Sequence, residues 1–487
     1  MNKSNKQGLW PFRGIMLDAA RQTERYAYYE RLIPDLARWG YNTIILHLAD
    51  DEGCAIKLDS PRLLATSGAL PVHQWRTLVK LAAQHGISII PEIECLGHTG
   101  YITRLPEYAH LREPPGQKGL YWSICPIHPQ TLEFMEAIFR AIADIFPAPY
   151  IHIGMDEADI GGSALLKEAL RSKPLWRIFG DYLVRINAIV QKLGRRSMAW
   201  GDHLLMHKEL RDMAPRDMVI CNWLYGKGHR EDYEKTTLYF LDAGFDVLGC
   251  PSGCWGGTQF IPRRENLANL LEFSNTCRSL NHKNILGMLN TMWCPYRHLP
   301  AVVHPIMAYA GKLFSGDTGA FDDFITGFVA RQFGLDGPAL RSAAGGIAGL
   351  HTARSQSFFD KVLLSEKPET LGERQMDIQY VLEACASAET ALLRAKSDVQ
   401  SLADEFEQWI FTAAFLRKLA QLRLSEMENA LPNAELRKGL YRSFQAACLK
   451  CRDYAGTQAE EPQMGQAGRY WQDTDNPVEL LAKLAKC

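Results

Sequence analysis

The amino-acid sequence predicts an α/β protein: a (β/α)8 barrel followed by an α-helical C-terminal region. Short apolar runs that end in polar residues recur over the first 318 residues, and amphipathic segments separate several of them. Runs that are apolar on both faces suit buried parallel strands. Eight such runs alternating with helices are typical of the (β/α)8 fold. We therefore predict a barrel domain over residues 1–318 and a helical domain over residues 319–487.

The eight candidate strands are each of a length that suits one crossing of a barrel. In chain order they are Gly14–Asp18, Asn42–Leu48, Ile87–Glu94, Tyr150–Asp156, Ser197–Trp200, Met218–Trp223, Asp246–Cys250 and Ile285–Trp293. Apolar residues at i, i+3 and i+4 spacing predict helices over Tyr26–Trp39 and Gln130–Phe146. The connection from Cys95 to Pro129 is unusually long and rich in Gly, Pro, His and aromatic residues, which is typical of a functional loop.

The pattern after residue 319 changes to long helices. Residues 377–428 contain no proline and place apolar residues at helical spacing, so two or three packed helices are expected. This region offers no catalytic pattern, and we expect it to brace the barrel or to form a homo-oligomer. Residues 456–476 read as an irregular loop and Pro477–Lys486 as a short helix. The expected buried stripe is Leu382, Cys385, Leu392, Val399, Leu402, Phe406, Ile410, Leu416 and Leu419.

Composition indicates an ordinary globular protein without a nucleic-acid or membrane partner. The chain has 54 Lys+Arg and 55 Asp+Glu, and 47% of its residues are hydrophobic. No basic arm, signal peptide or run of 18 apolar residues is present in the sequence. The twelve cysteines are scattered and mostly lie in apolar runs, which favours reduced core thiols and a cytoplasmic location. Cys448 and Cys451 form a CxxC without a second pair, so no zinc site is expected.

Polar residues gather where the predicted strands end, and barrel enzymes build their sites there. A lone aspartate at such a position is often only a helix cap, but here every one of the first five strands contributes. The residues are Asp18; His47, Asp50, Asp51 and Glu52; Glu92, Glu94 and His98; Asp156 and Glu157; Asp202 and His203. Aromatic residues lie at or just past the strand ends as well: Trp200, Trp223, Tyr225, Trp255 and Trp293. Charge beside indole rings suits a sugar, which has polar edges and a partly apolar face.

The adjacent carboxylates Asp156 and Glu157 point to one kind of sugar chemistry. An ordinary glycosidase places two carboxyl groups on either side of the scissile bond. Consecutive strand residues point to opposite faces, so this pair can share a pocket only if the strand breaks there. One acid could then protonate the leaving group while the other holds a nucleophile that belongs to the substrate, such as a 2-acetamido group.

Four motifs in order resemble glycoside hydrolase family 20, the β-N-acetylhexosaminidases. His152-x-Gly154-x-Asp156-Glu157 is similar to that family's His-x-Gly-x-Asp-Glu signature, and Arg13-Gly-x-x-x-Asp18 to its opening strand. The stretch from Asn42 through His47 to Asp50-Asp51-Glu52-Gly53 resembles its second strand and Asp-Asp turn, and Gly97-His98 its Gly-His pair. The resemblance covers about residues 10–295.

This resemblance implies an exo-acting enzyme that releases terminal β-linked GlcNAc or GalNAc with retention, through an oxazolinium ion and without metal or other cofactor. Glu157 would be the general acid and base, and Asp156 would orient the acetamido group. Arg13 would bind sugar hydroxyls, and His98 with Asp50 or Asp51 would tune Glu157. Trp200, Trp223 and Trp293 would wall the pocket, and we expect Asp202, Tyr225 and Trp255 to line it. The expected partner is a small oligosaccharide or glycoconjugate.

Two positions depart from the family pattern. The family commonly carries a Tyr near the seventh strand that contacts the acetamido oxygen, and the stretch Gly249–Trp255 contains none; Tyr225 is a candidate replacement. The family also often has a Glu two residues past the eighth-strand Trp, where this sequence has Pro295. The preference between gluco and galacto sugars therefore stays open.

Two alternatives belong to other functional classes. A metal-dependent barrel hydrolase could use His47, His98, Asp156 and His203, residue types that suit zinc or manganese. The first strand lacks the His-x-His pair expected of such an enzyme. A sugar-binding protein on a decayed barrel would bind without turnover, although retention of both Asp156 and Glu157 argues against decay.

Overall fold

A computed structural model describes residues 10–114, 122–225, 230–255, 258, 260–353 and 375–429, with a few residues beyond 434. Eight parallel strands form a closed barrel, because the first strand pairs with both the second and the last. Around the barrel they are β1 (Phe12–Asp18), β2 (Thr43–Asp50), β5 (Ser88–Ile93), β8 (Tyr150–His152), β9 (Arg196–Trp200), β10 (Val219–Trp223), β11 (Asp246–Cys250) and β13 (Ile285–Met292). The predicted fold class is confirmed, and all eight predicted strands are present.

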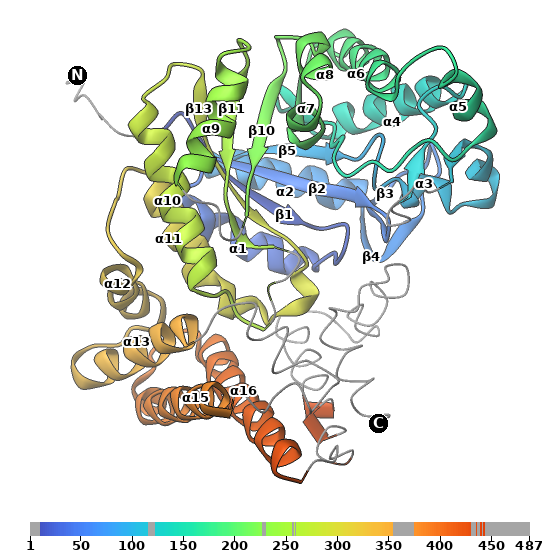
Figure 1. Ribbon diagram of the computed structural model, residues 1–487. Coiled ribbons are helices and arrows are strands. Elements are labelled where there is room, and N and C mark those ends of the chain that lie inside the picture. Colours follow the sequence, from blue (N-terminus) through green and yellow to red (C-terminus); the bar gives the residue numbers. More distant parts are fainter. Residues whose placement is uncertain are drawn as a thin grey trace.

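Helices cover the outside of the barrel (Figure 1). α1 (Tyr26–Trp39) has the predicted bounds, and α4 (Thr131–Ile145) is one residue shorter at each end than predicted. Gly40 ends α1 in the left-handed conformation with φ of 106°, as helix-terminating glycines commonly do. The other longer helices of the layer are α2 (Val72–Gln84), α6 (Leu175–Lys192), α9 (Arg230–Leu241), α10 (Arg264–Leu280) and α11 (His304–Phe314).

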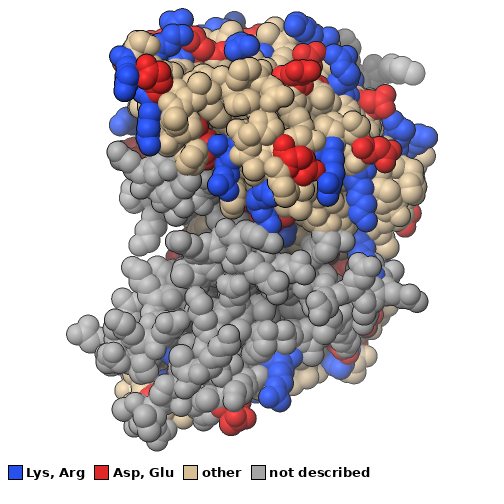
Figure 2. Space-filling model, turned by 90° about the vertical axis from the view of Figure 1, so that its right-hand side faces the viewer, with Lys and Arg blue, Asp and Glu red and all other residues tan. Residues whose placement is uncertain are grey.

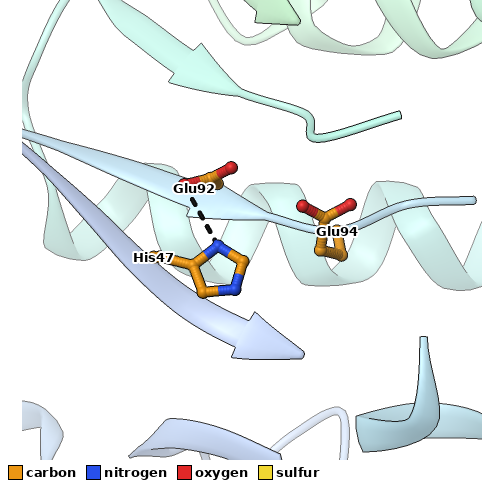
Figure 3. A group of neighbouring side chains, drawn as sticks. All are labelled: His47, Glu92 and Glu94. Atoms are coloured by element: carbon orange, nitrogen blue, oxygen red, sulfur yellow. Dashed lines mark ion pairs between the residues drawn. The ribbon is translucent and has the colours of Figure 1, made fainter. Parts of the chain in front are cut away.

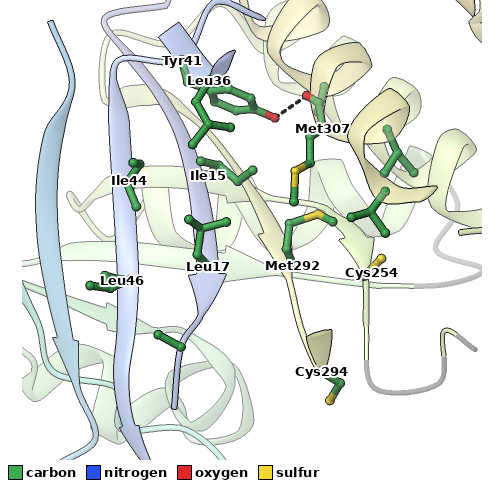
Figure 4. Packing of buried hydrophobic residues seen from close by; sticks show 14 of the residues in the cluster. Ile15, Leu17, Leu36, Tyr41, Ile44, Leu46, Cys254, Met292, Cys294 and Met307 are labelled. Carbon is green, nitrogen blue, oxygen red and sulfur yellow. Dashed lines mark hydrogen bonds between the residues drawn. The ribbon is translucent and has the colours of Figure 1, made fainter. Parts of the chain in front are cut away.

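The core has two layers because alternate strand residues face opposite sides of the barrel wall. Met16 and Ile45 point into the barrel, where they pack with Leu289. Ile15 and Ile44 point outward against the helices (Figure 4). In this outer layer the Tyr41 hydroxyl also donates a hydrogen bond of 2.7 Å to the Met307 carbonyl oxygen. The outer layer thus ties β1 and β2 to α11.

Short elements between the barrel strands were not predicted. β2 turns back into β3 (Gly53–Lys57), which pairs with β4 (Ala65–Pro71). Within the long 95–129 connection lie α3 (Gly100–Thr103) and the pair β6 (Arg112–Glu113) and β7 (Ser123–Ile124). β12 (Ser252–Cys254) follows β11 and pairs with β13. Further short helices between the strands are α5 (Ala164–Ala169), α7 (Asp202–Met206), α8 (Lys208–Met213) and the 3-10 turn η1 (Pro106–Leu111). After β13 come the 3-10 turns η2 (Pro295–Arg297), η3 (Pro300–Val303) and η7 (Lys396–Asp398).

The C-terminal region is helical in its described part and lies beside the barrel (Figure 1). It comprises α12 (Phe321–Phe333), α13 (Gly337–Thr352), α15 (Gln375–Ala395) and α16 (Ala403–Asn429). Cys385, Leu392, Phe406, Leu416 and Leu419 of the predicted stripe are buried, and Leu382, Val399 and Ile410 are half-buried. Leu402 is 38% exposed because it lies in the connection between α15 and α16 rather than on a helix. The loop and helix predicted over residues 456–486 fall outside the described residues.

The helical region contacts the loops that follow β12 and β13. Gln408 of α16 accepts a hydrogen bond from the Ala301 N–H at 2.9 Å, and His304 Nδ1 lies 3.3 Å from Glu405 Oε2. Nδ1 of His351 lies 2.8 Å from the Pro262 carbonyl oxygen. The helices therefore pack against segments at the carboxyl end of the barrel strands.

The described surface carries charges of both signs, and the described interior holds free cysteines. Lys or Arg and Asp or Glu side chains are interspersed on the described part of the face in Figure 2. Among the helices that the structure describes, none is long and apolar enough to cross a bilayer. The cysteines of the described ranges are all free and buried, and the CxxC at 448 and 451 lies outside them.

Candidate active site

Asp156 and Glu157 lie where β8 breaks. The strand ends at His152 instead of at Asp156 as predicted, and Gly154, Met155 and Glu157 have φ of 63°, 79° and 45°. A Cβ at Gly154 would overlap the Glu94 carboxylate, so only glycine fits this left-handed position. The turn replaces the alternation of a strand, and both carboxylates face one side chain, that of His98.

His98 joins the two carboxylates. Its Nε2 lies 3.3 Å from Glu157 Oε2 and 3.9 Å from Asp156 Oδ2. The Asp156 side chain is 11% exposed, whereas the Glu157 side chain is 38% exposed. The two carboxylates thus differ in exposure. Asp156 is held inside the barrel mouth, whereas Glu157 reaches solvent, where a leaving group would depart.

The other nitrogen of His98 faces the second strand. Nδ1 lies 3.4 Å from Asp50 Oδ1 and 3.6 Å from Asp51 Oδ2, and the Gly100 N–H donates to Asp51 Oδ1 at 2.9 Å. Burial alone would lower the pKa of His98, but Asp50, Asp51 and Glu157 raise it well above its usual range. The carboxylates on both sides of the ring therefore favour the protonated imidazole.

Asp50 is the most heavily paired carboxylate of the site. Arg21 Nη2 lies 2.8 Å and His47 Nε2 2.7 Å from Asp50 Oδ2, and the same guanidinium contacts Asp18 at 3.1 Å. Burial would raise the pKa of Asp50, but Arg21, His98 and His47 hold it well below its usual range. Arg21 also lies over the Trp293 ring at 5.2 Å, so a buried cation borders the aromatic wall.

The structure corrects the expectation for Arg13. Its guanidinium donates hydrogen bonds to the carbonyl oxygens of Gly40 and Trp10, both at 2.7 Å. Arg13 stands near the start of β1, whereas Asp18 ends that strand. Because barrel sites form at the carboxyl ends of strands, the cation of the site is Arg21. The sequence held the signal, since Arg21 follows Asp18 by three residues.

The predicted aromatic residues form one wall. Trp200 and Trp293 have ring centroids 5.9 Å apart, and Trp293 Nε1 donates to the Tyr225 hydroxyl oxygen at 2.9 Å. Tyr225 in turn stacks on Trp255 at 6.4 Å and lies 5.0 Å from Trp223. These rings come from the ends of four strands, and only the barrel closure brings them together.

Asp202 and His203 hold the turn of the carboxylate pair. Asp202 Oδ2 accepts the Glu157 N–H at 3.1 Å, and His203 Nε2 accepts the Ala158 N–H at 3.0 Å. Both residues open α7, just past β9. Asp202 therefore acts on the backbone of Glu157, a more specific contact than the general pocket lining that the sequence predicts.

Two buried carboxyl groups of the site, Asp156 and Glu94, have raised pKa values. Burial, with Asp202 and Glu157 nearby, raises the pKa of Asp156 to about 7, against the opposing effect of His98. Burial and the neighbouring Asp156 raise the pKa of Glu94 well above its usual range. Perturbed carboxyl groups of this kind are typical of catalytic sites.

The ligand set proposed for a metal hydrolase is not gathered in one place. In the described part of the chain, His47 groups with Glu92 and Glu94, and His98 groups with Asp50 and Asp51. His203 is bonded to the backbone of Ala158 instead. Of the four, only His98 and Asp156 lie near each other, at 3.9 Å, and the described residues do not gather all four around one point, which does not favour a metal shared by this set.

A barrel whose strand ends converge on paired carboxylates beside stacked aromatic rings has the site of a carbohydrate-active barrel protein. Residues 10–299 match the model of "Glycosyl hydrolase family 20, catalytic domain". That match covers more than half of the chain, so the chain belongs to glycoside hydrolase family 20.

Relatives by sequence carry names of the same family. A "Beta-hexosaminidase" of Vibrio furnissii is 27% identical over 338 residues, which is 58% of this chain and 52% of that protein. The "Beta-hexosaminidase subunit beta" of Felis catus is 24% identical over 306 residues, 52% of this chain and 57% of that one. The chain thus spans only about half of the length of these relatives.

Solved structures show the same fold. An exo β-N-acetylglucosaminidase of Vibrio harveyi in complex with N-acetylglucosamine has a TM-score of 0.53 at 22% identity, covering 71% of this chain and 59% of that one. A β-N-acetylhexosaminidase of Streptomyces coelicolor A3(2) has a TM-score of 0.52 at 18% identity, covering 72% and 71%. At these identities the likeness establishes the fold.

Proposed function

We propose that this protein is an exo-acting β-N-acetylhexosaminidase that hydrolyses terminal β-linked GlcNAc or GalNAc with retention, by substrate-assisted catalysis. The proposed substrates are small oligosaccharides or glycoconjugates. The observation that carries the proposal is the left-handed turn after β8, which gives Asp156 and Glu157 unequal exposure beside one shared imidazole. The names of the sequence relatives support the same activity.

Glu157 would act first as an acid. Its side chain is the exposed member of the pair, and it would donate its proton to the glycosidic oxygen as the bond to C1 breaks. The acetamido oxygen of the substrate would form a bond to C1 and give an oxazolinium ion. Glu157 would then take a proton from water as that water attacks C1. The bond from C1 to the acetamido oxygen breaks, so the oxazolinium ring opens and the β-configuration is restored.

Asp156 would act on the acetamido group. As a carboxylate it would accept the acetamido N–H and stabilise the positive charge of the oxazolinium ion. Its low exposure strengthens this interaction, because a charge inside a low-dielectric site is screened less than one in water. The charged form is required, and the raised pKa of about 7 means that it predominates only above neutral pH in the free protein.

Tyr225 would complete the acetamido pocket. Its hydroxyl oxygen accepts hydrogen bonds from Trp293 Nε1 at 2.9 Å and Thr291 Oγ1 at 3.1 Å. A tyrosine hydroxyl also carries one proton to donate, and the acetamido oxygen is a suitable acceptor. This assignment offers a replacement, from the end of β10, for the tyrosine absent from the stretch after β11.

The test is a side-by-side assay of 4-nitrophenyl β-glycosides of GlcNAc, GalNAc, glucose and galactose, with and without a chelator. Release of nitrophenol from one or both N-acetyl substrates only, unchanged by the chelator, is the expected result. Turnover of the plain glucoside or galactoside would mean that the acetamido group is not the nucleophile. Loss of turnover on chelation would favour the metal-dependent alternative, and binding without turnover a sugar-binding role.

We further propose a homo-oligomer formed through the helical region, as the sequence predicts. Met376 and Tyr380, one turn apart on α15, are 87% and 48% exposed, and a second copy of the chain would cover this pair of apolar side chains. Light scattering of the purified chain tests this, and a monomer at assay concentrations would contradict it. The cytoplasmic location likewise stays a proposal, which fractionation of the source cells would test.

A further inference from the structure

Glu92 on β5 binds groups from three other strands (Figure 3 shows its contact with His47). Its Oε1 accepts the Trp200 Nε1–H at 2.7 Å and lies 3.2 Å from His152 Nδ1. Its Oε2 lies 3.1 Å from His47 Nδ1. Glu92, His152, His47 and Trp200 are at most 1% exposed. A fully buried carboxylate therefore joins the Trp200 indole to an imidazole on β2.

The contacts continue from His47 to the acid. His47 Nε2 lies 2.7 Å from Asp50 Oδ2, and Asp50 Oδ1 lies 3.4 Å from His98 Nδ1. His98 Nε2 lies 3.3 Å from Glu157 Oε2. From Glu157 to Trp200 the side chains thus alternate between carboxyl and nitrogen groups, with successive N···O distances of 3.3, 3.4, 2.7, 3.1 and 2.7 Å. One end of this series is the proposed proton donor, and the other is a wall of the proposed sugar pocket.

We propose that Glu92 is a positioning residue that couples the proton relay of Glu157 to the placement of the Trp200 indole. The proposal rests on the proposed function, since it concerns the same site. Glu92 does not reach a substrate, because it is fully buried behind Trp200 and His47. It acts through these two side chains.

The coupling depends on the charge of Glu92 as well as on its shape. Burial would raise the pKa of Glu92, but His152 and His47 lower it below its usual range, so the group is ionised. Burial would lower the pKa of His47, but Glu92 and Asp50 raise it well above its usual value. A buried ion pair of this kind is costly to break from one side, since the remaining charge loses its partner.

Other ionisable groups also act on this series. Those that face Glu92 or His47 from the surrounding strands are Asp50 from β2, Glu94 just past β5, His152 and Asp156 at β8, Cys221 from β10 and Cys250 from β11. Most of these groups are acidic. Glu92→Gln would remove one negative charge from among them and leave the site less negative. His47 would then lose its proton more readily, and Asp50 would interact more strongly with His98.

The prediction is a linked effect of Glu92→Gln on rate and pH profile. The amide keeps the size of the side chain but not its charge, and misplacement of reacting groups can cost on the order of 10²-fold in rate. We expect kcat/KM for 4-nitrophenyl β-GlcNAc to fall by about this factor. The alkaline limb of the pH profile, which reports loss of the Glu157 proton, should move to lower pH, because the loss of a negative charge from this buried series favours the ionised form of Glu157.

Two further variants separate coupling from simple loss of structure. Trp200→Phe removes the indole N–H together with one of its two rings, and should lower kcat/KM without moving the alkaline limb. Ser197→Ala, a buried change on the same strand as Trp200, should leave both quantities unchanged. If Glu92→Gln does not fold by circular dichroism, His47→Gln interrupts the same series between Glu92 and Asp50 and replaces it.

A pair of leaving groups shows whether the effect reaches Glu157. The 2,4-dinitrophenyl glycoside needs little protonation, so Glu92→Gln should lose less activity on it than on the phenyl glycoside, whereas Trp200→Phe should lose equally on both. Suppose that the wild type is active, but that Glu92→Gln shows an unshifted alkaline limb and equal losses on both glycosides. That result would overturn the coupling alone. A wild type inactive on both glycosides would contradict the proposed function as well.

Discussion

The two ends of β1 each carry an arginine, and the two arginines do different work. Arg13 near the amino end donates to the backbone carbonyl oxygens of Gly40 and Trp10 and ties the chain to the start of the barrel. Arg21, just past the carboxyl end, pairs with the buried carboxylates of Asp18 and Asp50. A guanidinium that is bonded to neutral carbonyl oxygens holds the backbone in place. A guanidinium between two buried carboxylates also favours their ionised forms.

The same contrast holds for the barrel as a whole. Toward the amino ends the interior is filled by apolar side chains such as Met16, Ile45 and Leu289. At the carboxyl ends, buried ionisable groups replace them: His47, Asp50, Glu92, His98 and Asp156 are all less than 9% exposed. Buried charges weaken a fold unless they are paired, so their concentration at one end indicates a functional requirement there.

The largest effect is expected at the exposed carboxylate. Glu157→Gln removes the proton donor while it keeps the hydrogen-bonding shape, and general acid catalysis contributes ~10²–10⁴-fold. We expect a loss of kcat within this range on 4-nitrophenyl β-GlcNAc. Wild-type turnover in this variant would contradict the assignment of Glu157.

Asp156→Asn should cost about 10²-fold in kcat/KM, since an oriented electrostatic contact to the developing charge is lost. In the wild type, the charged form of Asp156 is the active one, so kcat/KM should fall as the pH drops through about 7. This acid limb should be absent in Asp156→Asn. A pH series of both proteins checks this, and an unchanged limb would show that another group titrates.

Asp156→Asn should lower the activity but raise the stability of the folded protein. The folded pKa is raised to about 7, so the wild type loses stability as the pH rises from the unfolded value of ~4 toward 7. The Asn side chain does not ionise, so the variant avoids this cost. At pH 8 it should be more stable than the wild type by on the order of a few kcal/mol, as a pKa shift of this size implies. Denaturant unfolding at pH 5 and pH 8 measures this, and an equal difference at both pH values would argue against it.

Arg21→Gln tests the carboxyl end of β1. Removal of one partner of a buried ion pair typically costs ~3–5 kcal/mol, and Asp18 and Asp50 both lose their guanidinium here. We expect lower stability together with a loss of kcat/KM on the order of 10²-fold, because the position of His98 depends on Asp50. Full activity in a folded Arg21→Gln protein would remove Arg21 from the site.

Arg13→Gln is the matched change at the amino end, and the smallest effect is expected there. It removes hydrogen bonds to two carbonyl oxygens, worth ~1 kcal/mol each in stability, and should leave kcat/KM unchanged. Thermal unfolding and the glycoside assay of both arginine variants, measured together, give the comparison. A selective loss of activity in Arg13→Gln would restore the role that the motif resemblance implies.

The sequence by itself determined the barrel and the family. Strand and helix patterns depend on local spacing, so all eight strands and the helix over Tyr26–Trp39 could be predicted, as could the pair Asp156-Glu157, whose signature is contiguous. The break of β8 was also implied, because adjacent carboxylates cannot share a pocket on a regular strand.

Only the tertiary structure decided which distant residues meet. Arg13 lies within a recognised motif, yet strand direction sends it to the other end of the barrel from Arg21. Trp200 and Glu92 are 108 residues apart in sequence, and no local pattern pairs them. Barrel closure brings strand ends together from across the chain, so charge states and contacts that depend on such neighbours, including the raised pKa of Asp156, follow from the fold and not from the spacing of residues.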